Sequence, residues 1–307
     1  DGAITGSSTI TGTSFNGIPF FSDTTNGSIY THDVSGTDST AQFNTAYGLT
    51  ALDAITTGDN NVAIGHNAGG AINTGASNTL IGFQAGRDIT DDTNNVAIGF
   101  RAGSNLTESS NVAIGSDAAR LGTSFTDSVV IGTSAIGTGV ATGTANIVIG
   151  KTAGEILTSA ASTILIGHSA GQALTTGGDN IFIGQDAGDD HDAETNNLGI
   201  GKGALGGPIN GGENNVAIGN FSQDALTAGD ENVSVGYHSM GGVNTGKQNV
   251  AIGYTAMQGL TSGDDNIAIG RTAMRNGVTT GDGNIAIGSV AGDDMTSGAG
   301  NVLVGFE

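Results

Sequence analysis

Histidine is the side chain that most often serves as a metal ligand or general base near neutral pH. The sequence has five, at His32, His66, His168, His191 and His238. His66 and His168 occupy equivalent positions in an internal repeat but lie six repeat units apart. At about 4.8 Å per stacked unit, some 29 Å would separate them, which is too far to share a metal. We therefore expect exposed histidines, no catalytic residues and no metal site.

Paired acidic residues are the other candidates for chemistry. Asp189-Asp190, Asp264-Asp265 and Asp293-Asp294 stand in predicted turns. Carboxylate oxygens suit a hard cation such as Ca²⁺, but no EF-hand spacing and no glycine-aspartate nonapeptide is present. We expect solvated charge and no cofactor, with Ca²⁺ as the one alternative.

Composition excludes several classes of protein. The chain has 307 residues, with 8 Lys and Arg against 29 Asp and Glu, a net charge of −21, and no Cys. A cysteine-free chain has neither disulfides nor thiolate zinc sites. Such acidity argues against nucleic acid as a partner, and the short apolar runs argue against a membrane span. Because the chain begins at Asp1, we expect a processed product or a fragment, and its acidity favours an extracellular location.

A repeat of about 17 residues governs the chain. The segment Asn61-Val62-Ala63-Ile64-Gly65 recurs with its glycine in sixteen copies, from Gly48 to Gly305, at intervals of 16 to 18 residues. Positions below are counted from this key glycine. Ile or Val stands at −1 in fifteen copies, Ala at +3 in thirteen, and an apolar residue at +7 in most.

This pattern predicts an all-β parallel β-solenoid of about sixteen coils over residues 44–307. One copy is too short to bury its own apolar side chains, so successive copies must stack. We expect the Ile column at −1 to pack with the Ala column at +3 in the core. Residues 1–43 do not keep the repeat phase, so we assign them to a leader that acts as a cap or exchanges a strand. No capping segment follows Phe306-Glu307, so we expect a removed segment or another chain to cover that end.

Two further columns carry structural expectations. Gly recurs ten times at −7, which predicts a turn with positive φ. Asn stands at −4 in fourteen copies, where a stacked ladder could link the side-chain amides of neighbouring coils or close turns locally. The predicted ladder includes Asn61, Asn78, Asn95, Asn111, Asn180, Asn249, Asn266 and Asn284.

The +1 column is the candidate partner surface, because strand alternation should turn it outward and it concentrates aromatic and basic side chains. We expect it to pack against a sister subunit; unremarkable surface exposure and a receptor glycan are the alternatives. Its members include Phe83, Phe100, Lys151, His168, Lys202, Tyr237, Tyr254, Arg271 and Phe306.

The phrases Asn-Val-Ala-Ile-Gly-x-x-Ala-Gly and Thr-Thr-Gly-Asp-x-Asn resemble the head repeats of trimeric autotransporter adhesins. Asn44-Thr45-Ala46-Tyr47-Gly48 is similar to a repeat of phage tail-fibre proteins, and the leader from Phe21 to Asp33 also looks like tail-fibre sequence. The resemblance covers about residues 20–307. It implies a left-handed β-roll in an elongated, exposed and usually trimeric stalk.

From these observations we expect a non-enzymatic fibre protein, extracellular, on a cell surface or on a virion, that serves attachment or adhesion. Its expected partners are copies of itself, as a homotrimer or a head-to-tail polymer, and a cell-surface glycan or receptor. One alternative is a self-assembling filament joined head-to-tail through the leader by strand addition. A second is an acyltransferase of the hexapeptide-repeat type, which Ile64-Gly65-His66-Asn67-Ala68-Gly69 partly resembles.

Overall fold

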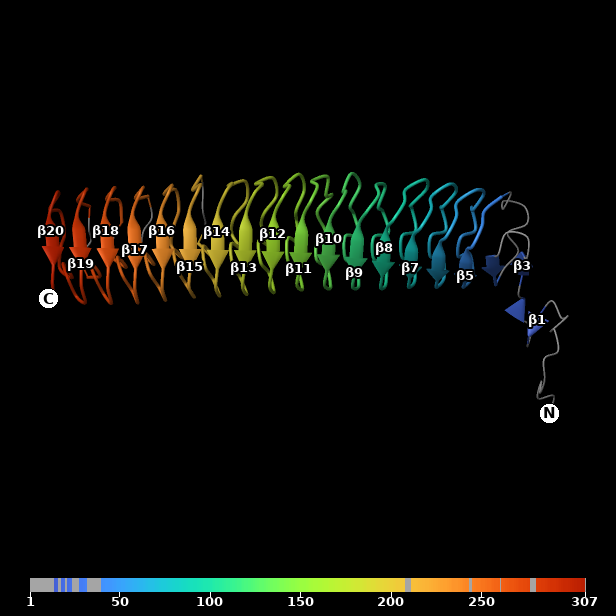
Figure 1. Cartoon of the computed structure of the whole chain (residues 1–307), viewed down its shortest axis with the longest axis horizontal. Helices are drawn as coiled ribbons and strands as arrows, with labels where there is room; N and C mark the ends of the chain where they lie inside the picture. Colours follow the sequence, from blue (N-terminus) through green and yellow to red (C-terminus); the bar gives the residue numbers. More distant parts are fainter. Residues whose placement is uncertain are drawn as a thin grey trace, which may run out of the picture.

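The chain folds into a straight stack of coils, seen side-on in the computed structural model (Figure 1). The structure describes residues 14–15, 18–19, 21–23, 28–31, 40–207, 211–242, 245–259, 261–276 and 280–306. Within these residues, seventeen strands form one parallel sheet of a β-solenoid with about 15 turns and a spacing of about 17 residues. The predicted fold class is confirmed. No helix with the length and apolarity needed to cross a membrane occurs in the described part of the chain.

From β5 on, each coil contributes one strand of three residues, directly before its key glycine; β1 to β4 belong to the leader. The strands are β1 (Ser14–Phe15), β2 (Ile18–Pro19), β3 (Phe21–Asp23), β4 (Ser28–Tyr30), β5 (Thr45–Tyr47), β6 (Val62–Ile64), β7 (Thr79–Ile81), β8 (Val96–Ile98), β9 (Val112–Ile114), β10 (Val129–Ile131), β11 (Ile147–Ile149), β12 (Ile164–Ile166), β13 (Ile181–Ile183), β14 (Leu198–Ile200), β15 (Val216–Ile218), β16 (Val233–Val235), β17 (Val250–Ile252), β18 (Ile267–Ile269), β19 (Ile285–Ile287) and β20 (Val302–Val304).

Neighbouring strands pair in perfect repeat register. Val62 lies opposite Thr79 and Ile64 opposite Ile81, so equivalent residues stand directly above one another. Backbone hydrogen bonds between coils continue beyond the strands: the Asn67 N–H donates to the carbonyl of Leu49 at 2.9 Å, and the Gly69 N–H to that of Ala85 at 3.0 Å. Coils are therefore joined around much of their perimeter.

The leader contributes strands to the same stack. β4 pairs in parallel with β5, so that Tyr30 lies opposite Ala46, and its side chain is buried. β3 pairs antiparallel with β4, while β1 and β2 pair antiparallel with each other. The ladder of strands thus begins before residue 44. Thr31 and residues 40–43 of the leader are also described, whereas His32 lies outside the described residues.

The core has a different composition from the one predicted. Ala63, at −2, is fully buried, whereas Ile64 at −1 is 39% exposed and Val62 at −3 is half-buried. The expectation that the Ile column at −1 fills the core is therefore wrong. A coil of only 17 residues leaves little interior space, so the inward strand position holds mainly small residues beside Ala68 at +3, and the bulkier core side chains come from +7, as at Ile72.

Two glycine columns allow the coils to approach closely, for different reasons. Gly236 at the key position has φ +141°, and a Cβ there would lie 2.3 Å from the carbonyl oxygen of Gly253 in the next coil. Gly58 at −7 would place a Cβ 2.1 Å from the Gly75 carbonyl oxygen. Its φ is not positive, so the predicted reason for glycine at −7 is wrong. Steric room, not turn conformation, requires glycine there.

Candidate functional site

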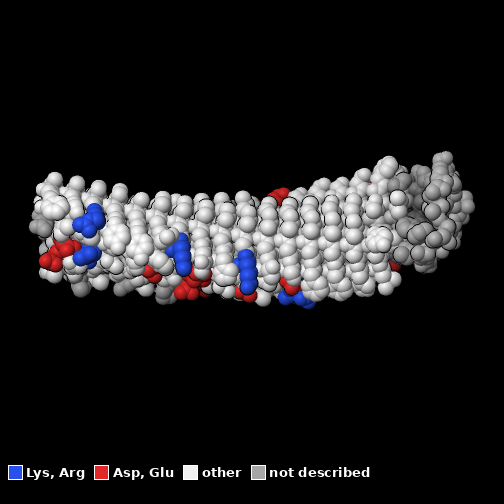
Figure 2. Space-filling model, turned by 90° about the horizontal axis from the view of Figure 1, so that it is seen from below, with Lys and Arg blue, Asp and Glu red and all other residues white. Residues whose placement is uncertain are grey.

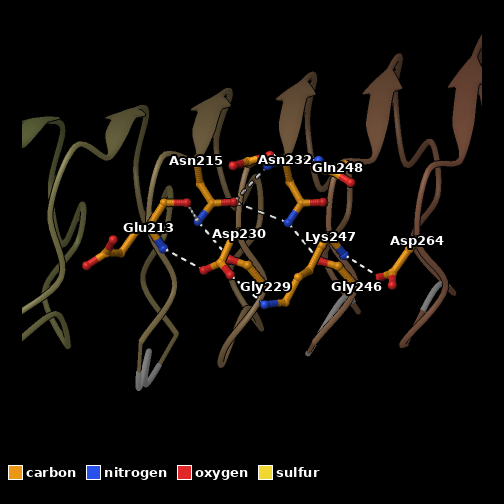
Figure 3. Close-up of polar contacts among 10 residues, drawn as sticks. Glu213, Asn215, Gly229, Asp230, Asn232, Gly246, Lys247, Gln248 and Asp264 are labelled. Carbon is orange, nitrogen blue, oxygen red and sulfur yellow. Dashed lines mark hydrogen bonds and ion pairs between the residues drawn. The ribbon is translucent and has the colours of Figure 1, made fainter.

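The asparagine column at −4 forms a buried ladder along the rod (Figure 3). Oδ1 of Asn215 accepts the backbone N–H of Asn232 at 3.0 Å, and Nδ2 of Asn215 donates to the carbonyl of Gly229 at 2.8 Å. Asn232 repeats both contacts with the following coil, donating to Gly246 at 2.8 Å. Nδ2 of Asn232 also donates to Oδ1 of Asn215 at 3.2 Å.

The other predicted ladder residues occupy the same buried position. The backbone N–H of Asn78 donates to Oδ1 of Asn61 at 3.0 Å, that of Asn95 to Asn78 at 2.9 Å, and that of Asn111 to Asn95 at 2.9 Å. Further along, Asn180 donates to the carbonyl of Glu194 at 2.7 Å. Asn249, Asn266 and Asn284 continue the ladder toward the last coil. Nδ2 of Asn95 has no hydrogen-bond partner, but Oδ1 of Asn95 accepts from the next coil as the other ladder oxygens do, so the column holds the stack together.

The outward side of the strands is an apolar surface, which we call the strand face and define as the −3 and −1 columns of β5–β20. Ile252 is 40% and Ile269 36% exposed, although both are paired strand residues. No acidic or basic residue occurs at −3 or −1 in any copy. On a chain of net charge −21, such an uncharged apolar ladder is a candidate interaction surface.

The +1 column lies just past the end of each strand, and the structure places all the predicted members on the surface. Phe100 is 46% exposed and stacks on Phe83 with ring centroids 5.2 Å apart. His66 continues this stack at 5.3 Å, and Tyr237 stacks on Tyr254 at 5.4 Å. The other predicted members are also exposed: Lys151, His168, Lys202, Arg271 and Phe306.

Charged side chains are sparse on the side of the rod seen in Figure 2, toward which the strands run in Figure 1. Five of the eight basic residues form ion pairs: Arg87 with Asp88, Arg101 and Arg120 with Asp117, Lys247 with Asp230, and Arg275 with Asp293. Among the described residues, the three without an ion pair are those of the +1 column: Lys151, Lys202 and Arg271.

Acidic residues at −6 act mainly as partners of the backbone. Oδ1 of Asp230 accepts the N–H of Glu213 at 3.1 Å, and its Oδ2 lies 2.6 Å from Nζ of Lys247 (Figure 3). Although burial alone would raise the pKa of Asp230, its hydrogen bonds to Lys247 and Glu213 lower it below the ordinary value. The part of the chain that the structure describes contains no group of three His, Cys, Asp or Glu side chains placed to hold a metal ion.

His191 departs from the expectation of exposed histidines. It is fully buried, its ring lies 4.7 Å from that of Phe182, and neither ring nitrogen has a hydrogen-bond partner. Burial lowers the pKa of His191 to about 4. The position of His191 in the repeat indicates this burial, because His191 stands at +7, where Leu157 and Leu174 fill the core in the preceding coils.

Two carboxylates in the same coil as His191, those of Asp189 and Glu194, have pKa values that are shifted in opposite directions. Burial, followed by repulsion from Asp190 and Asp186, raises the pKa of Asp189 to about 6. Burial also acts to raise the pKa of Glu194, but N–H groups of Gly211 and Asp192 donate to its carboxylate and bring the pKa below its usual value. The coil between Gly184 and Gly201 therefore contains the buried His191 and Glu194 together with the half-exposed Asp189.

No protein-family model matches the chain, and a search of curated proteins finds no match. The fold and the geometry therefore define a class: a β-solenoid repeat protein with one short parallel strand per coil. Within that class, two surfaces stand out, the strand face and the +1 column.

Proposed function

We propose that the chain is a structural rod without catalytic activity, which projects from a cell surface or a virion in the manner of a tail fibre and serves attachment. Continuous hydrogen bonding between coils and the buried asparagine ladder support a stiff element of this kind. Its purpose would be to hold a binding surface at a distance, and the similarity of its repeats to tail-fibre and adhesin sequences agrees with this role.

The observation that carries the proposal is the exposed strand face. The strand face contains sixteen strands, which are spaced about 4.8 Å apart and are each about 10 Å long. Together they make an apolar surface of about 700 Å². A standard protein interface buries about 800 Å² per partner. The area is of the size that proteins bury in stable interfaces and suits packing against copies of the same chain. In the proposed assembly three subunits pack side by side around one axis, and each divides its strand face between two neighbours.

Electrostatics favours the same arrangement. Copies that each carry a charge of −21 repel one another wherever their acidic columns meet. The strand face has no charged residue, so packing through it brings apolar side chains together without burying a carboxylate. Ile252 and Ile269 would then lose the exposure that they have in the single chain.

Substitution of the strand face tests the proposal. We expect the wild-type chain to sediment as a trimer, and the double variant Ile252→Asp/Ile269→Asp to sediment as a folded monomer. The matched control Thr57→Asp/Thr74→Asp adds the same charge at exposed positions away from the strands and should remain trimeric. A wild-type monomer would contradict the side-by-side assembly. Assemblies of variable mass would favour the head-to-tail filament, and calorimetric binding of an acyl-coenzyme A would favour the acyltransferase alternative.

A further inference from the structure

The +1 column has a composition that the rest of the surface does not share. It contains aromatic residues, three unpaired cations, two histidines and uncharged hydrogen-bonding residues, with Leu49 as its one aliphatic member and no acidic residue. In chain order, it reads Leu49, His66, Phe83, Phe100, Ser116, Thr133, Lys151, His168, Gln185, Lys202, Asn220, Tyr237, Tyr254, Arg271, Ser289 and Phe306.

The placement of the cations is selective. The molecule has 29 acidic residues for 8 basic ones, so a basic residue placed at random would readily find a carboxylate. Lys247, for example, pairs with Asp230 at 2.6 Å. Lys151, Lys202 and Arg271 instead stand in a column from which acids are absent. Their charges are therefore free to meet an anion brought by a partner.

The aromatic residues flank these cations along the same line. Tyr237 and Tyr254 are stacked between Lys202 and Arg271 in the column, and Phe221 and His238 lie against Tyr237. Nζ of Lys202 lies 6.0 Å from the centre of the Phe221 ring. Tyrosine offers apolar contact area together with a hydroxyl group, a combination that suits partners carrying both C–H and O–H groups.

The shape of the column restricts the partner further. Lys151 and Lys202 are three coils apart, about 14 Å, and Lys202 and Arg271 are four coils apart, about 19 Å. Such a straight line of well-spaced cations fits an extended polymer with recurrent single negative charges. Duplex nucleic acid carries a charge about every 1.7 Å, far denser than three cations over about 34 Å can match.

We propose that the +1 column binds a linear acidic polysaccharide, with Lys151, Lys202 and Arg271 contacting its carboxylates and the exposed rings and amides contacting its sugar rings. This inference rests on the proposed attachment role and names its ligand class. It concerns the +1 column, whereas the proposed trimer packs through the strand face.

Binding of polygalacturonate, a linear polyuronate, tests the inference. We expect the wild-type rod to bind it in biolayer interferometry, with affinity that falls as salt rises, and not to bind neutral dextran. The triple variant Lys151→Gln/Lys202→Gln/Arg271→Gln should bind at least ten times more weakly. The matched triple variant Arg87→Gln/Lys247→Gln/Arg275→Gln has the same net charge and removes only ion-paired cations, so it should bind like the wild type.

Several outcomes would overturn the inference: absence of binding, equal loss in both triple variants, or binding of polyglutamate as tight as that of polygalacturonate. The variant Tyr237→Ser/Tyr254→Ser should weaken binding while the three cations remain, and unchanged binding would contradict the role of the rings. Circular dichroism verifies folding of each variant. Sedimentation of the same samples reports self-association independently, so failure of the trimer and failure of polysaccharide binding are separate results.

Discussion

Asn215 and Asn232 lie one above the other in adjacent coils, and Oδ1 of Asn215 accepts both the backbone N–H and the side-chain N–H of Asn232, at 3.0 and 3.2 Å. A single side-chain oxygen thus joins two coils twice, within a fully buried column. The stability of the rod should therefore respond strongly to changes in this column.

Replacement of Asn232 by Ala should lower the free energy of unfolding by about 2–3 kcal/mol. The change leaves the buried N–H of Asn249 and the carbonyl of Gly246 without their partners, and each unsatisfied buried group costs about 1–3 kcal/mol. Urea denaturation followed by circular dichroism measures the effect. Thr74→Ala, at an exposed position, is the control and should change stability by less than about 0.5 kcal/mol. Equal effects would contradict the role of the ladder.

Replacement of Gly236 by Ala should destabilise the chain by at least about 3 kcal/mol, because the new Cβ meets the Gly253 carbonyl and φ is +141°. Gly283 provides the control: its φ is +66°, but a Cβ there has no atom within 4 Å. Gly283→Ala should lower the free energy of unfolding by only about 1–2 kcal/mol, the cost of holding an alanine in the left-handed conformation. Thermal unfolding of the two variants compares them directly, and a similar loss in both would show that close approach is unimportant.

His191→Leu should stabilise the rod, and increasingly so in acid. The folded pKa of about 4 lies below the ordinary 6.5, so as pH falls from 6.5 to 4 the unfolded chain takes up a proton that the folded chain does not. This group's contribution to wild-type stability should fall by about 1.4 kcal/mol per pH unit in that window. Urea midpoints at pH 7, 6 and 5 for wild type, His191→Leu and the exposed-site control His168→Leu measure the difference. A constant gap between wild type and His191→Leu would contradict the burial of the imidazole.

Asp189→Asn should have the opposite pH dependence. The pKa of Asp189 is raised to about 6, so the stability that its protonation provides is fully present below pH 3.8 and is lost as pH rises through 6. Asp189→Asn should therefore be more stable than the wild type at pH 7, by about 1 kcal/mol because solvent screens this half-exposed group, and the advantage should vanish near pH 4. An advantage of Asp189→Asn that did not shrink in acid would rule out the raised pKa, and NMR titration of Asp189 measures it directly.

The repeat predicted the stacking, because no other arrangement places Gly65, Gly82 and Gly99 in equivalent environments. Which side of each strand faces inward could not be read from hydrophobicity. In Val62-Ala63-Ile64, the larger size of Val62 and Ile64 suggested that these two side chains form the core. The narrow coil instead has room only for the small Ala63 inside, and Val62 and Ile64 lie on the outer side. Strand alternation separates these residues into two sides and does not say which is buried.

The exposure of the +1 column was a sequence prediction, and its side chains lie outside the rod. The same strand alternation also turns the −1 column outward, which contradicts the predicted Ile core. That Lys151, Lys202 and Arg271 lack ion pairs could not be predicted, because it depends on which carboxylates neighbouring coils bring near. The burial of His191 was open to prediction from its +7 position. Its missing hydrogen-bond partners were not, because they depend on the packing of Phe182 and the adjoining turn.

The perfect register between coils has a consequence for how such a molecule can change over time. Because Ile64 meets Ile81 as Ile81 meets Ile98, each coil presents the next with nearly the same template. Gain or loss of one whole 17-residue unit, by unequal recombination within the gene, would alter the length of the rod by about 4.8 Å and preserve the backbone register between the remaining coils. The length of the rod can therefore change during evolution in steps of one coil, with little effect on the fold.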